Sequence, residues 1–341
     1  MDNKIKYSFY DLIELRYADP INSITLGKDI LIAGTMMGRT FFYCFSSKYQ
    51  RQLTDLSNEA ITSTSIDTNH NDSLYFSIGD EEVCEFLNEK GNNDYPESTR
   101  YKNYTNEEMH NNRCESCYTM LDKNKYLMLF FDEPYNANSP IMSYYCDFLI
   151  YSYDNERNKI EGKINLSNYV VPFEYTDNKF IFLEHLTEGK RKLSIFDFVT
   201  NTKTENEIAV GLGHVSFLRL VHNNFLIVRN YNIISVFDEK MKEICNLSYT
   251  KGEIESIDWY EDDSKKIILV VLDSSGNVTE YSIKDNKMEQ IGELCLNKVI
   301  EIDLEMKQKG LFDMELPYYV KANAKFIVIT CDYSCIIIKK I

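Results

Sequence analysis

Short apolar runs, in which every second residue is hydrophobic, recur along the whole chain. This alternation is typical of β-strands, and the spacing of an amphipathic helix is nearly absent. Four such runs follow one another in residues 253–294, and the turn Asp-Ser-Ser-Gly-Asn at 273–277 separates the second run from the third. We therefore predict a four-stranded antiparallel meander over 253–294.

The same pattern fills most of the remaining sequence. Turns at equivalent positions, such as Lys190, Asn232 and Gly276, lie roughly 40 to 45 residues apart, a period typical of radial repeats. The fourth strand is not evident in the second repeat unit, but the others are complete. These units cover residues 21–57, 60–88, 114–167, 169–210 and 214–249.

The two ends of the sequence each hold part of a unit. Residues 318–341 contain only three strands, and residues 5–15 form a strand that has no partner in the first complete unit. Joining them completes a seventh unit and leaves no long sheet edge open. We predict an all-β fold with one domain over 1–341: a seven-bladed β-propeller of four-stranded antiparallel blades, closed by the N-terminal strand.

The stretch Ala-Gly-Thr-Met-Met-Gly-Arg-Thr at 33–40 is similar to a phosphate-binding loop, but it is one residue too short and has Arg39 in the place of lysine. Such a loop leads into a helix, whereas Arg39 precedes Thr-Phe-Phe-Tyr-Cys-Phe, which favours a strand. We predict a structural hairpin in which Gly38, like Gly276, adopts a positive φ.

Some residues within the repeats indicate a family. Ile195-Phe196-Asp197 and Val236-Phe237-Asp238 end third strands, and Gly213-His214 opens a first strand. Over essentially the whole chain the pattern resembles the WD-repeat propellers, which have Trp-Asp and Gly-His at these places. The chain departs from that family because its single tryptophan, Trp259, lies in a first strand and no unit has the full Asp-His-Ser/Thr-Trp set. The resemblance implies a rigid platform that assembles other proteins without catalysis of its own.

The composition restricts partners and compartment. A net charge of −16 disfavours nucleic-acid binding, which needs a basic surface. No apolar run approaches the ~18 residues of a membrane span, and the N-terminus lacks the core of a signal peptide. Nine cysteines, an odd number, fit free thiols in a reducing compartment. We expect a cytoplasmic protein with no nucleic-acid partner and no membrane insertion.

Motifs for catalysis or metal binding are weak. Cys114 and Cys117 form a C-x-x-C motif with His110 nearby, but a structural zinc site needs four ligands and no second pair of this kind occurs. Cys331 and Cys335 are expected in a different blade. The five histidines form no recognisable triad. We expect no cofactor, no bound metal and no enzymatic activity.

Three segments interrupt the repeats and are expected to be insertions: a polar, Asn-rich loop at about 88–112, a long hairpin connection at about 133–146, and an enlarged connection at about 294–317. In a propeller the turns between second and third strands and the crossings between blades emerge on the same face. All three insertions would therefore crowd one face, together with the hairpin tip at Met36 and Met37.

Methionine and aromatic side chains are enriched where protein partners dock. We therefore predict that this face binds partners, with apolar and aromatic anchors and with Arg39 available for a partner carboxylate. The alternative is that the loops fold back and bury these side chains on their own blades. The predicted partner-binding residues are Met36, Met37, Arg39, Tyr135, Met142, Tyr144 and Tyr145.

The sequence thus favours a non-catalytic scaffold for one or more protein partners. Two alternatives stay open: an enzyme or small-ligand binder that works at the central channel, and an architectural subunit of a larger complex. The first requires a cluster of His, Asp and Glu on the innermost strands, where the sequence offers mainly Ser and Thr, as in residues 21–27 and 60–67.

Overall fold

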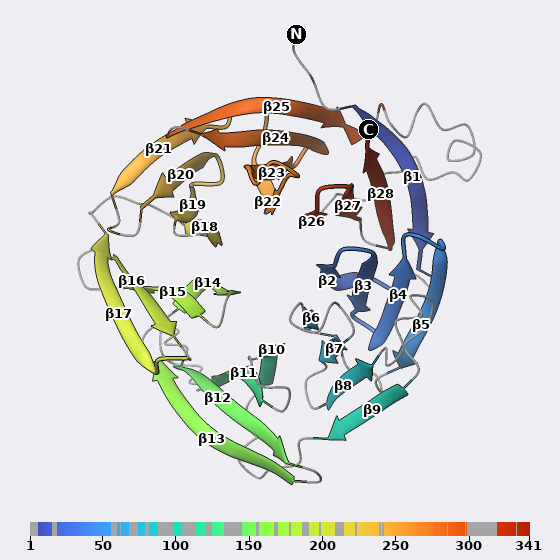
Figure 1. The fold of residues 1–341 in the computed structure, drawn as a ribbon, viewed down its shortest axis with the longest axis vertical. Coiled ribbons are helices and arrows are strands. Elements are labelled where there is room, and N and C mark those ends of the chain that lie inside the picture. The colour runs from blue at the N-terminus through green and yellow to red at the C-terminus, as the bar shows by residue number, and fades with distance from the viewer. Residues whose placement is uncertain are drawn as a thin grey trace, which may run out of the picture.

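The computed structural model describes a set of β-strands and the turns that join many of them. Its 28 elements are all strands and form seven four-stranded antiparallel sheets. The sheets are arranged around a common centre (Figure 1). The described residues are 6–15, 19–55, 60–61, 63–67, 74–78, 82–87, 98–103, 113–119, 125–132, 145–154, 157–166, 170–176, 179–185, 191–197, 199–208, 215–221, 224–238, 240, 242–284, 286–296, 298, 319–331 and 333–341.

The first three sheets follow one another along the chain. Sheet 1 contains β2 (Ile21–Leu26), β3 (Ile30–Thr35), β4 (Arg39–Cys44) and β5 (Tyr49–Asp55). Sheet 2 contains β6 (Ser63–Asp67), β7 (Leu74–Ile78), β8 (Glu82–Leu87) and β9 (Ser98–Asn103). Sheet 3 contains β10 (Arg113–Thr119), β11 (Lys125–Asp132), β12 (Tyr145–Asp154) and β13 (Arg157–Leu166).

The next three sheets have the same order. Sheet 4 contains β14 (Val170–Thr176), β15 (Lys179–His185), β16 (Arg191–Asp197) and β17 (Thr202–Ile208). Sheet 5 contains β18 (Val215–Val221), β19 (Asn224–Arg229), β20 (Ile233–Phe237) and β21 (Glu243–Ser248). Sheet 6 contains β22 (Ile254–Glu261), β23 (Ile267–Asp273), β24 (Asn277–Lys284) and β25 (Lys287–Cys295).

Sheet 7 joins the first strand to the last three. It contains β26 (Tyr319–Ala322), β27 (Phe326–Thr330), β28 (Ser334–Lys340) and β1 (Tyr7–Glu14), and β1 pairs with β28. The register sets Tyr7 opposite Lys340 and Glu14 opposite Ser334, with an irregularity between Phe9 and Asp11. The pairing predicted for residues 5–15 is therefore present.

The innermost strands of neighbouring sheets run in the same direction. Thr25 Oγ1 of β2 donates to Thr64 O of β6 at 2.6 Å, and Ala322 N of β26 donates to Asp258 Oδ2 of β22 at 2.7 Å. The two ends of all sheets consequently form two faces. We call the end with the hairpins between second and third strands and the crossings between sheets the crossing face, and the opposite end the turn face.

The hydrophobic core lies between adjacent sheets. One cluster joins sheets 6 and 7, and another joins sheets 7 and 1. Because each sheet is covered on both sides, its second strand is mainly apolar, and β3 and β27 are buried at every position. The fourth strand of each sheet lies outermost (Figure 1) and can be polar, as in β25, where Glu289 and Glu293 are exposed.

Turns are stabilised by aspartates that end strands. Asp238 Oδ1 accepts a hydrogen bond from Lys240 N at 2.9 Å, and Asp197 Oδ1 accepts bonds from Val199 N and Thr200 N at 2.9 and 3.0 Å. The bond from the Thr200 backbone holds the pKa of Asp197 below its usual value. These aspartates occupy the positions that were compared above with Trp-Asp of the WD-repeat propellers. Their carboxylates accept hydrogen bonds from backbone N–H groups of the turns that follow them.

The hairpins at Gly38 and Gly276 form as predicted. Both glycines have positive φ, 79° and 76°, and Gly276 N donates to Asp273 O at 2.9 Å. The strand β4 follows the first hairpin directly, so the stretch at 33–40 is a β-hairpin and not a phosphate-binding loop.

One expectation is corrected by the structure. Residues 88–112 were expected to be a polar loop, yet β9 lies within them and pairs with β8 from Glu82 opposite Asn103 to Leu87 opposite Ser98. An outermost strand is held by backbone hydrogen bonds and needs no apolar face, so its polar sequence does not prevent pairing. The remaining parts of the three expected insertions, 88–97, 104–112, 133–144, 297 and 299–317, lie outside the described residues.

Candidate partner-binding face

The hairpin tip between β3 and β4 presents two methionines on the crossing face. Met36 and Met37 are 48% and 55% exposed. Their backbone is fixed, because Met36 N donates to Pro20 O at 2.8 Å and Met37 N donates to Asp19 Oδ1 at 2.9 Å. The structure therefore holds two flexible apolar side chains on a rigid tip.

Asp19 organises this tip from the crossing that precedes β2. Its side chain is fully buried and accepts a hydrogen bond from Thr35 Oγ1 at 2.6 Å. Arg39 Nη1 lies 3.4 Å from Asp19 Oδ2, and Arg39 N donates to Thr35 Oγ1 at 3.0 Å. Arg39 is thus an internal partner of Asp19, and its guanidinium remains only partly exposed.

Two further aromatic residues on this face were not singled out by sequence reasoning. Tyr231 lies at the tip of the hairpin between β19 and β20 and is 45% exposed, and Tyr319 begins β26 and is 41% exposed. The other large apolar side chains exposed among the described residues, Val199 and Ile341, lie toward the turn face. Exposed methionine and tyrosine therefore gather on the crossing face.

The backbone of Tyr231 is unusual for a tyrosine. Asn230 and Tyr231 have φ of 48° and 59°, whereas glycine occupies the positive-φ position of the hairpins at Gly38 and Gly276. A side chain other than glycine in the left-handed region costs on the order of 1 kcal/mol. Asn230 indicates from the sequence alone a turn with a positive φ. Nothing in the sequence indicates that the next residue, Tyr231, also has a positive φ.

Hydrogen bonds tie the crossings to the hairpin tips of the preceding sheet. Ile61 N donates to Thr35 O at 2.8 Å, and Tyr249 N donates to Asn232 O at 2.7 Å. In sheet 6 the same relation joins Leu296 N to Gly276 O at 3.1 Å. These bonds fix the tips relative to neighbouring sheets, so the crossing face is a rigid surface over these parts of the chain.

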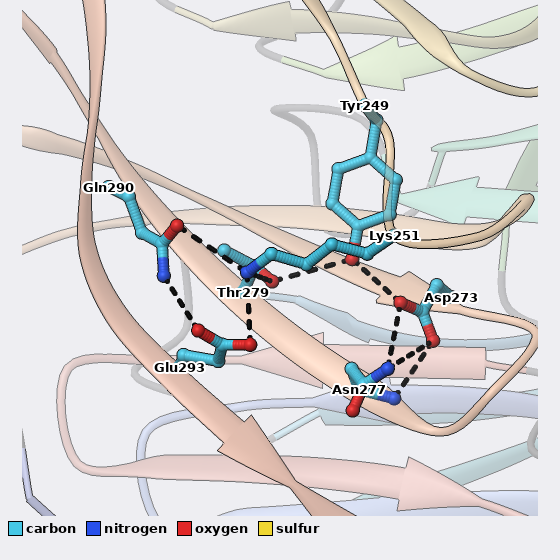
Figure 2. A network of polar contacts seen from close by, with 7 residues as sticks. All are labelled: Tyr249, Lys251, Asp273, Asn277, Thr279, Gln290 and Glu293. Atoms are coloured by element: carbon cyan, nitrogen blue, oxygen red, sulfur yellow. Dashed lines mark hydrogen bonds and ion pairs between the residues drawn. The ribbon is translucent and has the colours of Figure 1, made fainter.

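A polar network extends this arrangement between sheets 5 and 6 (Figure 2). Tyr249, which lies in the crossing, donates from its hydroxyl to Asp273 Oδ2 at 2.8 Å, and Thr279 Oγ1 lies 3.4 Å from the same hydroxyl. Asp273 Oδ1 also accepts from Asn277 N at 2.9 Å. Tyrosine in the crossing, aspartate at the hairpin and threonine on the third strand thus form one hydrogen-bonded set that joins the two sheets.

The outer part of the network is ionic. Lys251 Nζ lies 3.0 Å from Glu293 Oε1, and Gln290 Nε2 donates to Glu293 Oε2 at 3.0 Å. The bond to Lys251 holds the pKa of Glu293 below its usual value, while burial raises the pKa of Tyr249. Each group is therefore stabilised in its ordinary charge state at neutral pH. The network is suited to fixing the crossing rather than to moving a proton.

The side chains of the other four predicted site residues lie outside the part of the chain that the structure describes. Tyr135, Met142 and Tyr144 lie outside the described residues, and Tyr145 is the first residue of β12. Met36, Met37 and Arg39 are brought together by one hairpin. Whether the second set of residues joins them stays a prediction.

None of the cysteines that the structure describes with their side chains forms a disulfide: Cys44, Cys245, Cys295, Cys331 and Cys335. Cys331 and Cys335 are buried in two different core clusters, and Cys114 and Cys117 both lie in β10. Within the described part of the chain, no group of three or more His, Cys, Asp and Glu side chains is arranged to hold a metal ion. In the same part, no helix is long and apolar enough to span a membrane.

Comparison with known proteins identifies the fold. No protein-family model and no curated protein sequence matches the chain. The β-propeller domain of Cps50 (Swd1) from Myceliophteria thermophila is similar in structure, with a TM-score of 0.62, 11% identity, and coverage of 98% of this chain and 99% of that domain. The computationally designed protein Ika8 gives a TM-score of 0.57 at 9% identity, over 96% of this chain and 98% of the design.

The chain has a β-propeller fold. At such low identity the likeness concerns the fold alone.

Proposed function

We propose that this chain is a seven-bladed, WD-repeat-like β-propeller, closed by β1, that serves as a non-catalytic scaffold in the cytoplasm. It binds one or more protein partners through its crossing face, either as a free adaptor or as a subunit of a larger complex. The exposed Met36, Met37, Tyr231 and Tyr319 are the anchors. Arg39 supports the tip through Asp19 and offers its exposed edge to a partner carboxylate.

The observation that carries this proposal is the distribution of exposed apolar side chains. A methionine pair and two tyrosines occupy one face on backbone that is held by hydrogen bonds. Methionine and tyrosine are enriched at protein interfaces, and tyrosine is among the side chains enriched in binding hot spots. A rigid tip also reduces the entropy lost when a partner binds.

The test is affinity purification of the tagged chain from its own cells, with quantitative mass spectrometry of the proteins recovered. The variant carries Met37→Gln and Tyr231→Asn. Glutamine keeps the length of methionine without placing a charge beside Asp19, and asparagine tolerates the left-handed backbone at 231. The expected result is that partners recovered near one-to-one with the natural chain are lost from the variant.

The matched control is Val199→Gln, which removes an apolar side chain that is 63% exposed but lies on the turn face. We expect this control to retain every partner. Partners that persist with the Met37→Gln, Tyr231→Asn variant would contradict the proposed face. If no protein accompanies the folded natural chain, the scaffold proposal fails and the central channel becomes the place to search for a small ligand.

A further inference from the structure

The turn face of sheets 7 and 1 carries a concentration of positive charge. Its exposed basic side chains come from β1, from the turn after β2, from the β4–β5 connection and β5, and from the β26–β27 turn and β28. We call them the basic patch: Lys6, Lys28, Lys48, Arg51, Lys325 and Lys339.

Two hydrogen bonds and one contact between aromatic rings hold these segments together. Asn323 Nδ2 donates to Gly27 O at 3.0 Å, which joins the turn that contains Lys325 to the turn that contains Lys28. Ile341 N donates to Lys6 O at 2.8 Å. The rings of Phe45 and Phe326 stack with centroids 4.3 Å apart, which holds the β4–β5 connection against sheet 7.

The acidic residues beside the patch are directed to internal partners. Among the described residues of sheets 7 and 1, those away from the crossing face are Asp11 and Asp29. Asp11 Oδ2 accepts from Tyr43 Oη at 2.6 Å, and Asp29 Oδ2 accepts from Ser46 Oγ at 2.6 Å. Lys48 lies 4.0 Å from Asp11, so its charge is partly balanced. Among the described residues of these two sheets, the turn-face side thus has six exposed basic side chains beside two acidic ones.

This excess contrasts with the whole chain, which has 53 acidic and 37 basic residues. In such a chain a random group of basic side chains would be accompanied by a larger number of acidic ones. A local surplus of cations attracts an anionic partner at short range, within the ~8 Å over which charges act at physiological salt.

We propose that the basic patch binds an acidic segment of a partner protein. A short segment can contact the patch alone. An anionic membrane or a nucleic-acid duplex is extended, and on the turn face it would also meet the β22–β23 turn, where Glu261, Asp262 and Asp263 outnumber Lys265 and Lys266. The net charge of −16 adds repulsion for any large polyanion.

The inference goes beyond the scaffold function proposed above, because it concerns the opposite face and a different chemistry. A propeller with an apolar crossing face and a basic turn face can hold two partners at once without competition between them. Failure of either proposal leaves the other intact.

The test is a fluorescence-anisotropy titration of the full chain with a fluorescein-labelled oligoglutamate peptide. We expect binding that weakens as sodium chloride is raised from about 0.05 to about 0.3 M. Lys28→Glu with Lys325→Glu should weaken it by about tenfold or more, because two attractions become repulsions. The milder Lys28→Gln, Lys325→Gln variant should give an intermediate loss, and it keeps the test valid if the double reversal does not fold.

The matched control is Lys240→Glu with Lys242→Glu, which changes the net charge equally on the turn face of sheet 5, where both lysines are exposed. We expect it to alter binding by less than about twofold. The proposal is overturned if the peptide does not bind, or if the control weakens binding as much as the patch variant. Tighter binding to phosphatidylserine vesicles or to a short DNA duplex than to the peptide would also overturn it.

Discussion

Replacing Lys340 by methionine tests the buried polar cluster that joins sheets 6 and 7. Lys340 Nζ lies 3.0 Å from Glu280 Oε1, and the side chains of Lys340 and Glu280 are 7% and 0% exposed. The hydroxyl of Tyr260 donates to the same carboxylate at 2.8 Å, and the hydroxyl of Tyr7 donates to its other oxygen. Methionine keeps the apolar stem of lysine and removes only the charge and its hydrogen bonds.

The size of the stability loss depends on the interactions that Glu280 keeps after Lys340 is replaced. Removing one partner of a buried ion pair costs about 3–5 kcal/mol, because the other charge is left without compensation. The two phenols continue to donate to Glu280 and reduce this cost, while the lost contact of Lys340 Nζ with the Tyr260 ring, 3.4 Å from its centroid, adds to it. We expect Lys340→Met to lower the free energy of unfolding by about 3 kcal/mol.

The measurement is urea unfolding at pH 7, followed by circular dichroism and by the fluorescence of Trp259, the single tryptophan. The decisive comparison is the double variant Glu280→Gln, Lys340→Met, which leaves no uncompensated charge and should recover about half or more of the loss. The reasoning is refuted if Lys340→Met costs less than about 1 kcal/mol or if the two single losses simply add in the double variant.

Two further predictions concern the backbone. Tyr231→Gly should raise the free energy of unfolding, measured in a calorimetric scan, by about 1 kcal/mol, because glycine tolerates the positive φ at this position. A lower free energy of unfolding would contradict the inference that Tyr231 is strained. Gly292→Ala should destabilise the chain by about 1–3 kcal/mol in urea unfolding, since a Cβ would lie 2.0 Å from Tyr7 Oη; removal of the clash by Tyr7→Phe should restore little, because Glu280 then loses a donor.

The strand pattern was accessible from the sequence because each sheet has to bury both sides. Second strands such as β23 and β27 are apolar except at their last residue, and the hairpins after β3, β19 and β23 carry glycine or asparagine at a positive φ. The strand β9 was missed for the opposite reason. It lies outermost and is held to β8 by its backbone, so its polar sequence resembles a loop.

The candidate face was only partly accessible. Met36 and Met37 stand out because methionine is unusual at a hairpin tip, but the partner of Arg39 could not be foreseen, since Asp19 lies in a different segment and meets it only through the fold. Tyr231 was overlooked because a turn that begins with asparagine looks ordinary. Sequence patterns report local conformation well and contacts between distant segments poorly.

The cluster at Glu280 is the clearest case of a feature that only the fold creates, since Tyr7 and Glu280 are 273 residues apart. Burying a carboxylate and an ammonium together contributes little net stability, so the cluster at Glu280 must serve another purpose. β1 has to find one register on β28, and a slip by one residue would turn Tyr7 to the other side of sheet 7. Glu280 would then lose its hydroxyl donor in a buried site. We infer that this polar cluster selects the register of β1 on β28. Its loss in Glu280→Leu would permit slipped pairings, which hydrogen exchange of the β1 amides would detect.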